Sequence, residues 1–432
     1  MSQRDTIVNI ERALYTPWRI ACVYLFGTLA AYWLSRESTE EISNLGTLTA
    51  FVAVSYSCFL WGYSRGAAHR MAAQPADQPR DIGWYRTIFW GSCLWTVALN
   101  VGRLAGRSYY EGDILEALLN PGHAYRHKLE SIQMYAWLEE VNVVGQIYTL
   151  SYGVTLLFPA ILTVYWHLFR WPAKVLAILA LASGMLYDLA DGTNAAVGFT
   201  FSHCAVCMGA YYLWHKDGRH KLTALRVKSL LFAMGASFIG YFIVTQVTRT
   251  ETTSIYISDD LSSDKRSLLP EIRYGLDLLV FYPTHGYTGL AQCLELPFEW
   301  CYGLGHSRAL MEYAEQYFEF DKAREKHYLW RNQLETGRHP GIVWSTALPW
   351  FASDVSFWGV PPLLAIIGYL FGKSWKETIL FRSPVSLTLS AWLSLLVLFL
   401  PANNIIFQAR WSMFGTWELL AFYAWSRLVR RN

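Results

Sequence analysis

The chain has 432 residues, of which 53% are hydrophobic and only 16% are charged. Soluble domains carry about 25% charged residues, so this composition argues against a soluble protein and favours one embedded in a lipid bilayer. The formal net charge of +3 is too small to indicate a nucleic-acid partner. The aromatic content of 16% agrees with a membrane location, because Trp and Tyr favour the membrane–water interface.

Apolar segments recur along the whole chain at lengths typical of membrane-spanning helices, which need about 20 residues each. They are predicted at residues 17–34, 47–64, 86–105, 147–169, 174–189, 194–214, 226–248, 355–372, 384–402 and 411–427. The predicted fold class is therefore an all-α polytopic membrane protein with about ten transmembrane helices. We expect an N-terminal transmembrane bundle of about seven spans (residues 1–248), a large loop (249–354) and C-terminal spans (355–432).

The charges of the connecting loops predict the orientation of these spans. Lys and Arg are retained in cytoplasmic loops close to the span ends. Here they gather at the N-terminus, in 65–86, 170–174, 216–228 and 373–376, and in the C-terminal tail. The alternate loops are acidic or mixed, and with ten spans the two sets alternate without a violation. Both termini are therefore predicted to be cytoplasmic, and residues 249–354 to lie outside.

The large external loop combines half-apolar segments with many basic side chains. Helices that lie on the membrane surface are predicted at Leu276–Tyr282, Tyr287–Leu296 and Phe298–Leu304. Arginine side chains between them offer planar forks for bidentate contacts with phosphate. Such a surface suits a ligand that is half lipid and half anion. Each arginine could instead pair with a neighbouring carboxylate or a lipid headgroup.

Two runs in and after this loop resemble a known family. They are HGYTGLAQCLELPFEWCYGLGHSRAL (residues 285–310) and TALPWFASDVSFWGVPPLLAIIGYLFG (residues 346–372). They are similar to the oligosaccharide repeat-unit polymerases of bacterial surface glycans, the Wzy type. The matching positions are Tyr287, Gly289, Trp300, Tyr302, Gly303, Asp354, Phe357 and Gly359. The resemblance is diffuse and covers roughly residues 175–425. It departs from the family pattern at 191–194, where no Arg is present, and after Asp354, where no Gly follows.

The resemblance implies a multi-span, GT-C-like glycosyltransferase with a large helical periplasmic loop. Donor and acceptor would both be glycans on undecaprenyl diphosphate, joined into O-antigen or a related surface polysaccharide at the outer face of the bacterial inner membrane. No cofactor is expected. Membrane lipids are expected partners, and the resemblance leaves room for a chain-length-regulating co-polymerase.

Glycosyl transfer needs a base that accepts the proton of the attacking hydroxyl. The candidates are His339, Asp354, Glu295 and Glu299, with His285 and His306 as further external candidates. His339 lies in a turn before Pro340 and could equally be solvated, while Asp354 could simply cap the eighth span. Glu295 and Glu299 share one face only if a helix continues through Pro297, and they could instead belong to ion pairs with Arg273 or Arg308.

Glycosyl transfer also needs cations that compensate the charge of the leaving diphosphate. The candidates are Arg273, Arg308, Arg338 and Arg410. Tyr287 and Tyr302 are substrate-binding candidates through the resemblance. No metal site is predicted, because His203, Cys204 and Cys207 have no second pair of ligands and are better explained by helix packing.

Two other function classes remain open at this level. An O-antigen ligase would use the same donor with a lipid A-core acceptor. Such ligases place a His in a loop position comparable to that of His339, but the rest of their pattern is absent from this chain. A lipid-linked glycan transporter or flippase would need mid-span charges and paired broken helices, which the sequence does not display.

Overall fold

The structure is a computed structural model that describes residues 10–35, 42–70, 82–105, 143–190, 195–216, 221–252, 277–340 and 343–431. These residues form helices and turns, and no strand occurs among them, in agreement with the predicted all-α class. The chain divides into two compact units. Unit 1 comprises Met1–Pro79 with Val280–Asn432, and unit 2 comprises Arg80–Leu279. The predicted parts 1–248, 249–354 and 355–432 refer to the membrane and stay a prediction.

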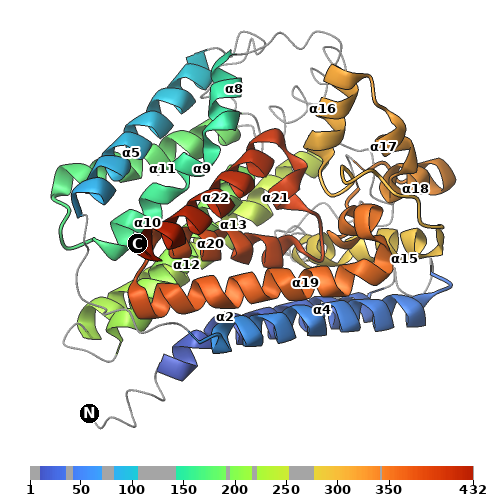
Figure 1. Cartoon of the computed structure of the whole chain (residues 1–432), viewed down its shortest axis with the longest axis horizontal. Coiled ribbons are helices and arrows are strands. Elements are labelled where there is room, and N and C mark those ends of the chain that lie inside the picture. The colour runs from blue at the N-terminus through green and yellow to red at the C-terminus, as the bar shows by residue number, and fades with distance from the viewer. Residues whose placement is uncertain are drawn as a thin grey trace. The chain divides into compact units, whose positions relative to one another are not determined.

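Unit 1 contains the first two predicted spans, residues 280–354 of the large predicted loop, and the last three predicted spans. Its helices are α2 (Thr16–Trp33), α4 (Leu45–Ala68), α15 (Gly286–Glu295), α16 (Arg308–Phe318), α17 (Lys322–Lys326), α18 (Tyr328–Thr336), α19 (Leu348–Phe381), α20 (Pro384–Phe399), α21 (Ile405–Gln408) and α22 (Arg410–Arg431). Figure 1 shows α4 lying along α19, with the short helices α15 to α18 gathered near the end where α19 begins.

Glycines allow α4 and α19 to pack with their backbones in contact. Gly62 and Gly66 of α4 face the backbone of Ala365 and Tyr369, and Gly368 and Gly372 of α19 face the backbone of Phe59 and Tyr63. A Cβ at any of these four glycines would overlap a backbone carbonyl of the other helix. Small residues four apart are the usual means of close helix packing in membranes, where water supplies no hydrophobic drive between apolar helices.

Helix α19 contains a break that separates a buried first part from the predicted span. Ser356 has φ 61° and ψ 168°, which a helix does not accommodate. The residues before it include the buried Trp350, Phe351 and Ala352. The helix axis therefore changes at the point where the sequence places the start of the eighth span, and Asp354 lies just before that change.

Unit 2 contains α5 (Ile82–Ala105), α8 (Val143–Leu150), α9 (Tyr152–Thr155), α10 (Leu157–Val164), α11 (Trp171–Ala190), α12 (Ala195–His215) and α13 (Lys221–Thr252). An apolar stretch of 18 residues within Leu222–Thr245 of α13 contains no buried residue. Phe232 is 80% exposed and Val244 60% exposed. Water disfavours such a helix surface, whereas lipid would cover it.

The predicted number of spans is not confirmed by the described helices. Among the described residues, four helices are long and apolar enough to cross a membrane: Leu45–Ala68, Trp171–Ala190, Leu222–Thr245 and Leu348–Phe381. Val143–Leu150 and Tyr152–Val164 qualify only as a pair bent by 65°. Each of the other predicted segments overlaps a helix, but α20 has only 16 residues and α22 carries several charges. These helices are consistent with a membrane protein, and the prediction of ten spans is not confirmed.

Candidate functional site

Helix α15, which precedes the site along the chain, is packed tightly against its neighbours. A Cβ on Gly286 would lie 2.5 Å from Pro401 O and 2.8 Å from Thr346 N, so the helix contacts two other backbone segments directly. The hydroxyl of Tyr287 is 2.9 Å from both Thr28 Oγ1 and Tyr56 Oη. Tyr287 is fully buried and joins α15 to α2 and α4, and its predicted contact with substrate stays a prediction.

The segment after α15 is a loop, and the predicted helix Phe298–Leu304 is wrong. Helix α15 ends at Glu295, and Leu296 is extended before Pro297, which cannot continue a helix. Glu295 and Glu299 therefore do not share a helix face. Ser43 Oγ donates to Glu295 Oε1 at 2.8 Å, and Arg331 Nη1 donates to Glu299 Oε1 at 2.9 Å. The ion-pair interpretation fits Glu299, whose partner among the described residues is Arg331.

Asp354 organises the loop that follows. Its Oδ1 accepts a hydrogen bond from Gly305 N at 2.9 Å, and its Oδ2 accepts one from His306 N at 2.8 Å. His306 Nδ1 lies 2.8 Å from the same Oδ2. The carboxylate is only 10% exposed. Asp354 thus fixes the loop 301–307 and orients the imidazole of His306. It does not act as the helix cap that the sequence analysis offered as an alternative.

A second histidine, His327, also forms a hydrogen bond with this loop. His327 is completely buried, with Nε2 2.9 Å from Gly305 O and Nδ1 accepting a hydrogen bond from Leu329 N at 3.1 Å. This pattern requires the neutral ring with the proton on Nε2. Burial lowers the pKa of His327 to about 3, and the Gly305 carbonyl opposes that shift only partly. His327 therefore has a structural role.

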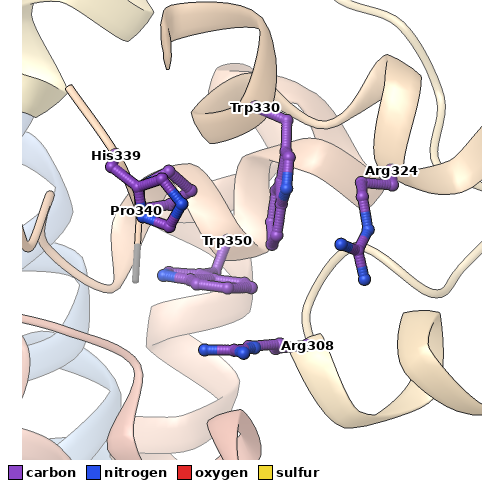
Figure 2. Close-up of a pocket in the computed structure, with 6 residues that line it drawn as sticks. All are labelled: Arg308, Arg324, Trp330, His339, Pro340 and Trp350. Carbon is purple, nitrogen blue, oxygen red and sulfur yellow. The ribbon is translucent and has the colours of Figure 1, made fainter. Parts of the chain in front are cut away.

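A cavity of about 200 Å³ lies beside this loop. It is lined by Arg308, Arg324, Trp330, His339, Pro340 and Trp350. Figure 2 shows the two indoles between His339 and Arg324, with Arg308 beside Trp350. The structure thus brings together two of the predicted site residues, Arg308 and His339. The sequence analysis missed Trp330, Trp350 and Arg324, and only their place in an aromatic, basic loop could have indicated them.

The arginines at the cavity belong to a network with acidic side chains. Arg308 Nε donates to Glu312 Oε1 at 2.7 Å, and Arg410 Nε lies 3.7 Å from Glu312 Oε2. Arg324 Nε donates to Glu315 Oε1 at 2.6 Å. Three guanidinium groups thus share two carboxylates at this side of the cavity. Arg410 and Arg308, both predicted to bind diphosphate, therefore lie close together at Glu312.

The guanidinium of Arg308 keeps donors for a ligand. Only its Nε bonds to Glu312, and among the described residues no partner is found for its two terminal nitrogens. The side chain is 44% exposed. An arginine fork that retains terminal donors at a cavity wall is suited to a phosphate oxygen pair.

The other predicted residues lie away from the cavity. Arg338 Nη2 donates to His285 O at 2.7 Å and so joins α15 to the turn before α19. His285 is buried against Phe281 and Trp344, and burial lowers its pKa to about 4. Tyr302 is exposed and accepts a hydrogen bond from Lys326 Nζ at 2.7 Å. Arg273 lies outside the described residues.

Comparison with known proteins identifies no relative. No protein-family description, curated protein or solved structure matches this chain. The function is therefore argued from the geometry of the site and from the resemblance noted in the sequence.

Proposed function

We propose that the protein is a glycosyltransferase that polymerises undecaprenyl-diphosphate-linked oligosaccharide repeat units into O-antigen or a related surface polysaccharide. The observation that carries the proposal is the cavity in which Arg308 and Arg324 meet the indoles of Trp330 and Trp350 and the imidazole of His339. The reaction would take place at the outer face of the bacterial inner membrane, with both termini in the cytoplasm.

The two types of side chain suit the two halves of such a donor. Indole faces offer large, rigid, apolar surfaces with a polar edge, which suit the C–H faces of sugar rings. The terminal nitrogens of Arg308 would contact the diphosphate, whose charge grows as the glycosidic bond to phosphate breaks. Helix α16 begins at Arg308 behind its N-cap Ser307, so its N-terminal partial charge favours an anion at the same place.

An O-antigen ligase is the second candidate function. His339, the residue on which that likeness depends, lines the same cavity. The donor and its contacts would be identical in the two cases, and only the acceptor would differ: a second lipid-linked repeat unit for a polymerase, and lipid A-core for a ligase.

The test is a transfer assay with the purified protein in lipid nanodiscs and an undecaprenyl-diphosphate repeat unit from the same organism. We expect a ladder of products on a gel, and loss of the ladder in Arg308→Ala and Trp330→Ala. Arg65→Ala is the matched control, because Arg65 lies over Trp61 at the far end of α4 and away from the cavity. Products that form only when lipid A-core is added would favour the ligase. A ladder that survives Arg308→Ala and Trp330→Ala unchanged would contradict the proposed site.

A further inference from the structure

The pair formed by His306 and Asp354 has the geometry of a general base with its orienting carboxylate. Asp354 Oδ2 lies 2.8 Å from His306 Nδ1, and a carboxylate at this place favours the tautomer with the ring proton on Nδ1 and the lone pair on Nε2. The imidazole is 28% exposed, and no described residue bonds to its Nε2. We propose that His306 is the catalytic base of the glycosyl transfer and that Asp354 is its positioning residue. This inference rests on the proposed function.

The backbone around His306 leaves the ring little freedom. Gly305 N and His306 N both donate to Asp354, and Asn404 Nδ2 donates to His306 O at 2.6 Å. A Cβ on Gly305 would lie only 2.6 Å from Ser353 Cβ, so the loop is pressed against α19. The ring itself stands edge-to-face on Phe407. A base held this firmly loses little freedom when substrate binds, which is what catalysis of proton transfer requires.

Two short connections link His306 to the cavity. Along the chain, His306 is followed by Ser307 and then by Arg308, whose guanidinium lines the cavity. Across the fold, Asn404 holds His306 O, while its neighbour Asn403 accepts a hydrogen bond from the indole of Trp350 at 3.1 Å. The base is therefore fixed to the same elements that position Arg308 and Trp350.

The other histidines of this region are less suited to the role. Both ring nitrogens of His327 are used in buried hydrogen bonds, and His285 is buried in an aromatic stack. His339 lines the cavity from an exposed turn. Of these four, His306 combines a partly exposed ring with a carboxylate that fixes its tautomer.

The step balances as a substitution at the anomeric carbon of the donor. The acceptor hydroxyl oxygen forms a bond to this carbon while the bond from the carbon to the diphosphate oxygen breaks. The diphosphate leaves with the electron pair of that bond. The proton of the hydroxyl passes to Nε2 of His306 and from there to the released undecaprenyl diphosphate or to water. No oxidant, reductant or further reactant is needed.

The test separates a base from a structural residue by means of His306→Asn. An Asn side chain keeps an N–H donor near the place of Nδ1 for Asp354 but has no counterpart of Nε2. We expect the single-turnover transfer rate to fall about 10²-fold or more, while donor binding and the unfolding temperature stay near the wild-type values. Added imidazole should partly restore transfer in His306→Ala, which a structural residue would not allow.

A second readout does not depend on turnover. Diethylpyrocarbonate acylates the unprotonated imidazole nitrogen, and peptide mass spectrometry locates the adduct. We expect rapid modification at His306 in the wild type and slower modification in Asp354→Asn. A wild-type protein that makes a ladder while His306→Asn keeps its full rate, or a His306 that resists the reagent, overturns the base assignment alone. A wild-type protein without any transfer activity overturns the proposed function as well.

Discussion

Replacing Gly286 by Ala tests the packing on which the site depends. The new Cβ would lie 2.5 Å from Pro401 O and 2.8 Å from Thr346 N, whereas ordinary contacts begin at 3.4 Å. One of the segments must therefore move by about 0.9 Å, and both neighbours are backbone atoms that cannot rotate away. Overpacking of this kind costs about 1–3 kcal/mol. The displaced turn precedes Asn403, which holds Trp350, so transfer activity should fall as well.

The matched control is Gly27→Ala in α2, where nothing lies within 4 Å of the new Cβ. That change should stabilise the protein by up to about 1 kcal/mol, because Ala is a better helix former than Gly. Unfolding of both variants in mixed micelles with increasing dodecyl sulfate gives the free energies. We expect Gly286→Ala to be less stable than Gly27→Ala by about 1–4 kcal/mol. Equal stability of the two variants would refute the close packing of α15.

Three further predictions concern buried charge and the cavity. The pKa of His327 is lowered from 6.5 to about 3 by burial, so the unfolded chain binds a proton that the folded protein excludes and stability falls below pH 6.5. At pH 5 this loss of unfolding free energy is about 2 kcal/mol. Denaturation at pH 7 and at pH 5 should show the loss in the wild type and not in His327→Asn, whose new side chain can still cap the helix. Arg427→Ala leaves the 8% exposed Glu377 carboxylate without its ion-pair partner. Thermal unfolding should show a loss of about 3 kcal/mol in the free energy of unfolding, and much of this loss should be recovered in the double variant with Glu377→Gln. Arg308→Lys keeps the charge but loses the planar guanidinium, so steady-state kinetics should show a raised KM and a lowered but measurable kcat. A variant with wild-type kinetics would argue against a bidentate contact.

Local sequence patterns are sufficient to predict a helix where its bounds depend on its own residues. Helix α15 was predicted at 287–296 and found at Gly286–Glu295, because apolar residues at helical spacing end at a proline. The loop after it was mistaken for a helix because the apolar spacing continues through Phe298–Leu304. Pro297 breaks the helix there, and Tyr302 and Gly303 adopt positive φ angles that a helix excludes.

The members of the site were harder to predict, because they meet only through long-range packing. Sequence alone named Arg308 and His339 but could not say that α16, α18 and the turn at 339–340 enclose one cavity. Neither could it show that Glu312 lies between Arg308 and Arg410, which are a hundred residues apart along the chain, or that Asp354 turns toward His306. Trp330 and Trp350 resemble many other aromatic residues in a membrane protein until the fold places them together.

The most direct test of the central claim measures two products in the same reaction. Wild-type protein in proteoliposomes is given the undecaprenyl-diphosphate repeat unit, and both the polymer ladder and the released undecaprenyl diphosphate are quantified. We expect one released carrier for each linkage formed, with both products reduced together in Arg308→Ala. If the repeat unit instead crosses to the other leaflet intact, with no linkage and no released carrier, the protein is a transporter and the proposed polymerase function is wrong.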